Sequence, residues 1–148
     1  ELASCKPISE ADLASYLCDC LVDQDKINQI LPIGGPGDAL SARQQGEMLF
    51  KALGKKPWMI SLPIALMDVP VGCLDFLSAR FPSLEDTAEF GKIGRYYAGE
   101  SMLVWDEQRQ QYDSDATPSY GTDTLEQFFE RVVRDGMDGQ DLGDAALF

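Results

Sequence analysis

The stretch at residues 27–41, INQILPIGGPGDALS, constrains the fold more than any other part of the chain. It begins with a short apolar run that ends at Ile33. The turn Gly34-Gly35-Pro36-Gly37 follows, and no regular element continues through such a turn. Ser41 then offers a side chain that caps a helix. The order of these features predicts a strand, a glycine turn and a helix.

The glycine turn also resembles a phosphate-binding loop, and its residues argue against that function. Loops that bind a pyrophosphate have spaced glycines directly before a helix, so that backbone N–H groups converge on the anion. Here the glycines are adjacent, Pro36 has no N–H, and no lysine follows. We therefore interpret the turn as a tight connection between two elements.

Apolar spacing and capping residues predict the other elements. Ser9, Ser41, Ser83 and Asp123 each begin a pattern that is typical of a helix N-terminus, and Gly54 and Gly136 are suited to helix ends. Helices are predicted over about residues 10–22, 42–53, 64–81, 84–97 and 124–135, and strands over about 27–33, 58–62 and 102–105. Residues 108–111 and 117–121 are predicted as turn and loop. This order predicts an α/β architecture with parallel strand pairing.

The segment 64–81 is the most apolar part of the chain. Its two carboxylates, Asp68 and Asp75, are seven residues apart and fall on one narrow face of a helix. A helix that is apolar nearly all round is usually buried, so a core position is our first interpretation. The alternative is a wall that contacts a large hydrophobic ligand, a lipid surface or a partner protein. Pro70 should kink this helix.

The net charge of the chain limits the kinds of partner that it can bind. A net charge of −13 argues against nucleic acid, because binding to phosphates depends on clustered lysine and arginine. The best basic cluster, Lys51 with Lys55 and Lys56, suits a solvated helix end. The acidic last third of the chain leaves a basic protein partner open. No apolar run of eighteen residues is present, so no transmembrane span is predicted.

The sequence lacks the common motifs of metal and redox chemistry. It has no histidine, and its cysteines, Cys5, Cys18, Cys20 and Cys73, form no C-x-x-C pair, so neither a zinc site nor a Cys–His nucleophile is predicted. We interpret these thiols as reduced and mostly buried. None of the five tyrosines begins the Tyr-x-x-x-Lys motif of short-chain reductases. The glycines in residues 136–143 follow a predicted helix, which indicates an acidic, flexible tail over residues 137–148.

Two charged clusters have modest functional interpretations. Glu85, Asp86 and Glu89 gather at a predicted helix start, where the helix dipole alone favours acidic residues. Arg95, which precedes Tyr96 and Tyr97, could present a guanidinium to an anion between aromatic faces. We favour packed aromatic rings with an exposed arginine.

Four separated blocks carry a family resemblance. The blocks CKPISEADLASYL, INQILPIGGPGDALSARQQGEMLF, AEFGKIGRYYAGESMLVWD and TPSYGTDTLEQFFERVVRDGMDGQDLG resemble the C-terminal part of the 8-vinyl reductases of chlorophyll biosynthesis, in the atypical short-chain dehydrogenase/reductase family. Those enzymes are expected to be roughly twice as long as this chain. The resemblance implies the C-terminal portion of a Rossmann-like α/β fold: a few-stranded sheet with several helices, incomplete without the N-terminal nucleotide-binding half.

The resemblance also implies a domain organisation. Residues 1–62 correspond to the last strand and helix units of the Rossmann-like fold, residues 63–136 to the substrate-side helical part, and residues 137–148 to the acidic tail. The family enzymes use NADPH to reduce the 8-vinyl group of a divinyl chlorophyll precursor, in the plastid or on cyanobacterial membranes. Their glycine-rich NADPH loop and catalytic centre lie in the N-terminal half, so no catalytic or cofactor-binding residue is assigned to this chain, and no metal ligand.

Three hypotheses about function follow. The first is a non-catalytic accessory subunit of a photosynthetic pigment–protein complex, peripheral on the stromal side of the thylakoid. The second is one piece of an active NADPH-dependent reductase that assembles with its missing N-terminal half. A general protein-binding module is the third. If chlorophyll is bound, a carboxylate, a carbonyl or water must ligate its magnesium, because histidine is absent. The candidate pigment or partner contacts are Leu66, Met67, Leu74, Phe76, Arg95, Tyr96, Tyr97 and Trp105.

Overall fold

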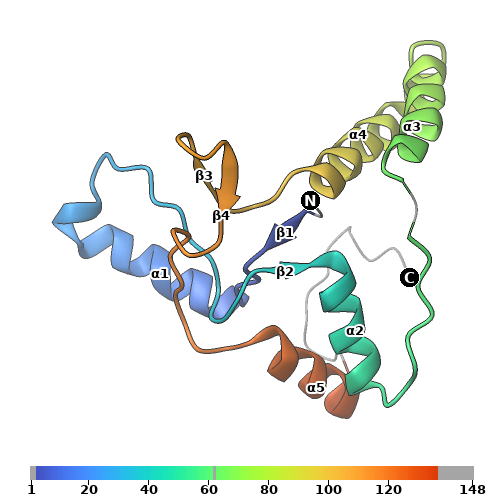
Figure 1. Cartoon of the computed structure of the whole chain (residues 1–148). Helices are drawn as coiled ribbons and strands as arrows, with labels where there is room; N and C mark the ends of the chain where they lie inside the picture. The colour runs from blue at the N-terminus through green and yellow to red at the C-terminus, as the bar shows by residue number, and fades with distance from the viewer. Residues whose placement is uncertain (1–2, 62, 137–148) are drawn as a thin grey trace.

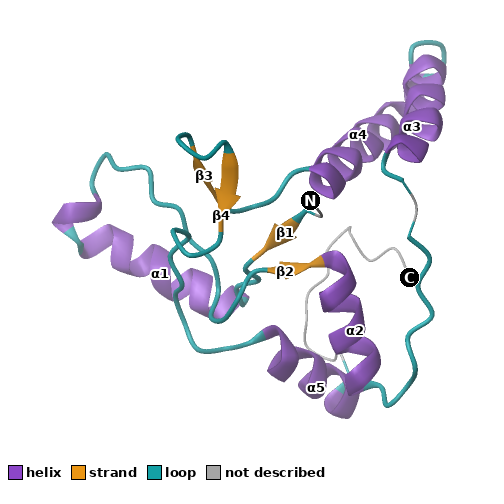
Figure 2. Ribbon diagram, in the orientation of Figure 1, coloured by secondary structure: helices purple, strands orange, loops and turns teal. Residues whose placement is uncertain are grey.

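The computed structural model describes residues 3–61 and 63–136, and in this part the chain is mixed α/β with five α-helices and four short strands (Figures 1 and 2). The predicted acidic tail lies outside these residues. The helices are α1 (Glu10–Val22), α2 (Ala42–Ala52), α3 (Ala65–Ser78), α4 (Glu85–Gly99) and α5 (Leu125–Asp135), with 3-10 turns η1 (Gln24–Lys26) and η2 (Pro82–Leu84). The strands are β1 (Ser4–Cys5), β2 (Leu40–Ser41), β3 (Val104–Asp106) and β4 (Gln111–Asp113).

The strands form two separate antiparallel pairs, so the prediction of parallel pairing is wrong. β1 pairs with β2, and β3 pairs with β4 across the predicted polar turn. The parallel contacts among the described residues are single bridges, Cys5 with Met102 and Gly34 with Ser119. Each strand is two or three residues long. Such ladders join distant segments without building a sheet that could cover a core.

Two of the three predicted strands do not form. Residues 27–33 are irregular, with Asn28 at a positive φ of 57° and Ile30 97% exposed. Pro32 has no N–H for a ladder, which weakens this run as a strand. Residues 58–61 are also irregular, and Leu62 lies outside the described residues. The third prediction, 102–105, is confirmed with a shift to Val104–Asp106.

All five predicted helices are present, and side-chain caps explain the starts of α1, α2 and α5, whereas α3 and α4 begin without one. Ser9 accepts a hydrogen bond from the N–H of Asp12, and Ser41 and Gln44 form a capping box. The last helix is capped by Thr124 with Gln127, so the predicted Asp123 cap is wrong by one residue. Ser83 also fails as a cap, because it lies inside η2. At the end of α5, the Arg134 guanidinium pairs with Asp135.

The glycine turn is confirmed as a tight connection. The N–H of Gly34 donates to the Pro118 carbonyl at 2.8 Å, and the N–H of Gly35 donates to the Lys6 carbonyl at 3.0 Å. The Gly34 carbonyl accepts from the N–H of Tyr120 at 2.9 Å. These backbone groups therefore hold three chain segments together and do not converge on an anion.

Two helix pairs form the packing units of the molecule. α3 and α4 pack side by side and project as a hairpin, and α2 packs on α5 (Figure 1). Among the described residues, the buried side chains are Ala88, which is 1% exposed, and Thr117. The predicted core position of segment 64–81 is wrong, because α3 meets one neighbouring helix and the rest of its apolar surface faces solvent. Pro70 lies inside α3 as expected. All four cysteines are free, and Cys18 and Cys73 are exposed, contrary to the expected burial.

Candidate functional site

The α3 side of the helix hairpin carries half of the predicted contact residues. Leu66 and Phe76 are more than half exposed, with Phe76 at 79%, and Met67 is 37% exposed. Leu74 lies differently, because its Cδ1 would be 3.9 Å from a Cβ built on Gly91 of α4. Leu74 therefore belongs to the packing between the helices. The other three form an exposed apolar surface on α3, which is the alternative that the sequence left open.

Ion pairs join the two helices of the hairpin. Nε of Arg95 donates to the Asp68 carboxylate at 2.6 Å, and Nζ of Lys92 lies 2.5 Å from Asp75 and 2.9 Å from Glu89. The hydrogen bonds from Lys92 to these two carboxylates raise the pKa of the ammonium. Arg95 is thus paired, while the neighbouring tyrosines are exposed. This arrangement is the reverse of the packed rings and exposed arginine that the sequence suggested.

Aromatic side chains gather where α4 leads into β3, and we call Tyr96, Tyr97, Trp105 and Tyr112 the aromatic corner. The rings of Tyr96 and Tyr97 meet edge to face with centroids 5.6 Å apart, as do those of Trp105 and Tyr112 at 5.0 Å. The Tyr112 hydroxyl donates to Glu100, directly after α4, at 2.5 Å, and this bond raises the pKa of the phenol. The bond ties the β3–β4 hairpin to the end of α4.

A groove of about 290 Å³ lies beside the aromatic corner. Its walls come from β1, the start of α2 and the end of α4, and Tyr97, Glu100 and Met102 form its α4 side. On the opposite side, the Gln45 amide donates to Sγ of Cys5 at 3.4 Å. Ligand pockets usually have volumes of about 300–1,000 Å³. The groove is therefore large enough for one edge of a big planar ligand and too small to enclose it.

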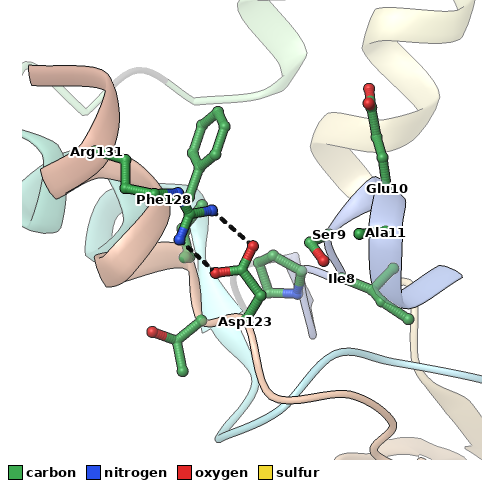
Figure 3. A pocket seen from close by; sticks show the side chains of 10 residues that line it. Ile8, Ser9, Glu10, Ala11, Asp123, Phe128 and Arg131 are labelled. Carbon is green, nitrogen blue, oxygen red and sulfur yellow. Dashed lines mark hydrogen bonds and ion pairs between the residues drawn. The ribbon is translucent and has the colours of Figure 1, made fainter. Parts of the chain in front are cut away.

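A second pocket, of about 370 Å³, lies between the N-termini of α1 and α5 (Figure 3). The Arg131 guanidinium binds the Asp123 carboxylate through two hydrogen bonds of 2.7 Å, and these lower the pKa of Asp123. Oδ2 of Asp12 accepts from the N–H groups of Thr122 and Asp123. Sequence reasoning missed this network, since an eight-residue spacing from Asp123 to Arg131 matches no motif and no local pattern links Asp12 to Thr122.

This ion pair predicts a specific acid sensitivity. A carboxyl group with a depressed folded-state pKa adds stability above its unfolded pKa of about 4 and loses that contribution as the pH falls through the lower value. The variant D123N should therefore be less stable than the wild type at neutral pH, by about 1 kcal/mol or less for a half-exposed pair. This difference in stability between D123N and the wild type should disappear toward about pH 2.5.

Urea titrations at several pH values, followed by tryptophan emission, measure this gap. The variant D38N is the control, because Asp38 is exposed and forms no ion pair with the described residues. Its unfolding midpoint should follow that of the wild type throughout. If D123N is still less stable than the wild type at about pH 2.5, Asp123 stabilises the fold through its shape and not through its charge.

Within residues 3–61 and 63–136, no three His, Cys, Asp or Glu side chains gather as metal ligands. No helix in the same ranges has the length and apolar character needed to cross a membrane. The described part is thus a mixed α/β unit that exposes the α3 surface, the aromatic corner and the groove. These surfaces are suited to apolar and aromatic ligands or partners.

Comparison with curated proteins identifies the relatives of this unit. The chain is 59% identical over all 148 residues to the chloroplastic divinyl chlorophyllide a 8-vinyl-reductase of Cucumis sativus and to that of Zea mays. It is 56% identical over 144 residues to the Arabidopsis thaliana protein of the same name. The chain is thus homologous to one part of the divinyl chlorophyllide a 8-vinyl-reductases, and the predicted resemblance is confirmed.

The chain spans 34–37% of the length of these relatives, which corrects the expected half. No family model matches the chain, and no solved structure matches it.

Proposed function

We propose that this chain acts as the substrate-side, C-terminal part of a divinyl chlorophyllide 8-vinyl reductase in the chloroplast. Together with the rest of such an enzyme, it reduces the 8-vinyl group of a divinyl chlorophyllide to an ethyl group. The identity of 56–59% over 97–100% of the chain carries this proposal. Identity at this level along the whole chain supports conservation of the fold and of the surfaces that contact the substrate.

In this proposal the chain contributes binding and the rest of the enzyme contributes redox chemistry. NADPH would supply the hydride and solvent the proton, and the remaining, Rossmann-like part would hold the cofactor. The exposed apolar surface of α3 and the aromatic corner support a role in contacting a large planar pigment, because aromatic faces stack on such rings. Leu66, Met67, Phe76, Tyr96, Tyr97 and Trp105 are the contacts that the structure leaves accessible. Arg95 acts by bridging α4 to α3.

A chimeric enzyme tests the proposal. In the Cucumis sativus reductase, the segment that matches this chain is replaced by the chain itself. The chimera should convert divinyl to monovinyl chlorophyllide in a plant or bacterial strain that lacks this activity, as measured by chromatography of extracted pigments. The intact cucumber enzyme is the positive control, and the same enzyme with the segment deleted is the negative control. A chimera that accumulates as folded protein and leaves all pigment in the divinyl form would overturn the proposal.

The second candidate function is a non-catalytic accessory subunit of a pigment–protein complex on the stromal side of the thylakoid. One observation favours it, the exposed apolar surface of α3, which suits a stable partner as well as a substrate. The comparisons add no support, since every relative found carries the name of a reductase. An inactive chimera, together with recovery of the native chain in a pigment–protein complex, would favour this function over the first.

A further inference from the structure

Residues 55–61 lie in the connection between α2 and α3, and all of them except Met59 are exposed. Trp58 is 81% exposed and Ile60 is 64% exposed, while Met59 between them is half-buried. Sδ and Cε of Met59 lie 3.5 and 3.2 Å from the position of a Cβ built on Gly46, so this side chain faces α2. Over residues 58–60, two outward apolar side chains flank one that faces α2, as in a short extended segment.

The backbone of this segment has no ladder to join. The N–H of Lys55 donates to the Phe50 carbonyl at the end of α2, and beyond it residues 56–61 make no backbone hydrogen bond to the described residues. No described strand lies beside the segment in Figure 2. Pro57 and Pro63 limit the length over which a ladder could form. Unpaired N–H and C=O groups in a row are a template for another strand.

The apolar side chains of this segment are unusually exposed. Trp58 is 81% exposed, although tryptophan is normally among the most buried side chains on average. Neighbouring exposed apolar side chains such as Trp58 and Ile60 mark a surface suited to a partner.

The relatives indicate what covers this surface. In each of them the homologous segment belongs to a polypeptide almost three times as long, because this chain spans only 34–37% of its length. A tethered neighbour is present at a high effective concentration, so it competes well against any free partner. A second copy of this chain has no such advantage.

We infer that residues 55–61 are a docking strand for the remaining part of the reductase. The segment adds to an exposed sheet edge of that part through main-chain hydrogen bonds, and Trp58 and Ile60 enter an apolar pocket beside it. Met59 keeps its contact with α2, so the docking strand fixes the α2–α5 pair against the rest of the enzyme. This inference rests on the proposed function, since the partner surface is that of the reductase.

Hydrogen–deuterium exchange tests the backbone part of the inference. The exchange rates of the amides of residue 56 and residues 58–61 are compared between the chain alone and the chimera with the cucumber reductase. Pairing with a sheet edge should slow their exchange by about tenfold or more in the chimera. The amides of residues 28–30 are the internal reference, because this irregular stretch is equally exposed and is not part of the docking strand.

Tryptophan fluorescence tests the side-chain part. The W105F variant leaves Trp58 as the single tryptophan of the chain. In a chimera whose cucumber part has its own tryptophans replaced by phenylalanine, acrylamide should quench Trp58 far less than in the chain alone. The substitution W58D should destabilise the chimera while leaving the chain alone unchanged within about 0.5 kcal/mol. The matched control, I30D, changes an apolar residue that is even more exposed, and it should alter the stability of neither protein.

The outcomes separate the docking strand from the proposed function. An active chimera with unprotected amides at 56–61 and an accessible Trp58 overturns the docking strand and leaves the function intact. Protection in an inactive chimera supports the docking strand and counts against the function. Protection that appears in the chain alone as its concentration rises, together with a dimer mass, would assign the strand to a second copy and overturn our assignment to the reductase.

Discussion

The G35A variant should fail to reach the native structure or lose more than about 4 kcal/mol of stability. A Cβ on Gly35 would overlap the Pro7 carbonyl oxygen and lie 2.6 Å from the carbonyl carbon of Pro7 and 2.8 Å from the Cα of Ile8. These are backbone atoms, so no side-chain rotation relieves the clash. The strand-like contact through the Gly35 N–H and the Lys6 carbonyl would have to break. Urea unfolding followed by far-ultraviolet circular dichroism measures the loss.

Two other glycine substitutions are matched controls for G35A. Gly72 lies inside α3 with no atom within 4 Å of a built Cβ, so G72A should stabilise the helix by about 0.5–1 kcal/mol. Gly37 also has open space but a φ of 95°, so G37A should cost only the backbone strain, about 1–2 kcal/mol. If G35A and G37A cost the same, conformation and not close approach would explain the glycine turn.

The helices could be predicted because their signals are local. The caps at Ser9 and Ser41, the apolar spacing and the left-handed Gly54 all act within a few residues, and the structure has each of them. The error at Asp123 is a shift of one residue to Thr124, whereas Ser83 lies inside η2 and α4 begins without a side-chain cap. The prediction that residues 1–62 and 63–136 are separate units remains a prediction, and α2 of the first packs on α5 of the second.

Strand pairing could not be predicted in the same way, because it depends on contacts between distant segments. Residues 58–61 have a strand pattern, yet no described segment pairs with them. The burial of α3 was predicted from composition, which reports that a surface is apolar and not what covers it. The sequence named the α3 residues and the α4 tyrosines as candidate contacts, but it favoured burial of α3 and packed rings, and the structure exposes both. It missed the Asp12–Asp123–Arg131 network, which only the fold assembles.

The T117V variant should lose about 2 kcal/mol of stability, because Thr117 is the buried polar side chain that fixes the β3–β4 hairpin. Its hydroxyl donates to the Asp113 carbonyl at 2.7 Å and accepts from the N–H of Val104 at 2.9 Å. Valine has almost the same shape and no hydroxyl. The Val104 N–H would then be left without its partner in a position that water reaches poorly, which costs more than the bond itself contributed.

The T117S variant separates the hydroxyl from the methyl group, since serine keeps both hydrogen bonds. It should cost less than about 1 kcal/mol, the value of a single buried methyl group. Emission from Trp105, next to Val104 on β3, reports the hairpin directly in a W58F background. If T117V loses stability and T117S keeps it, the hydroxyl group of Thr117 is the source of the stabilisation. Equal losses would assign it to packing, and the aromatic corner would then depend on the bond between Tyr112 and Glu100 for its position.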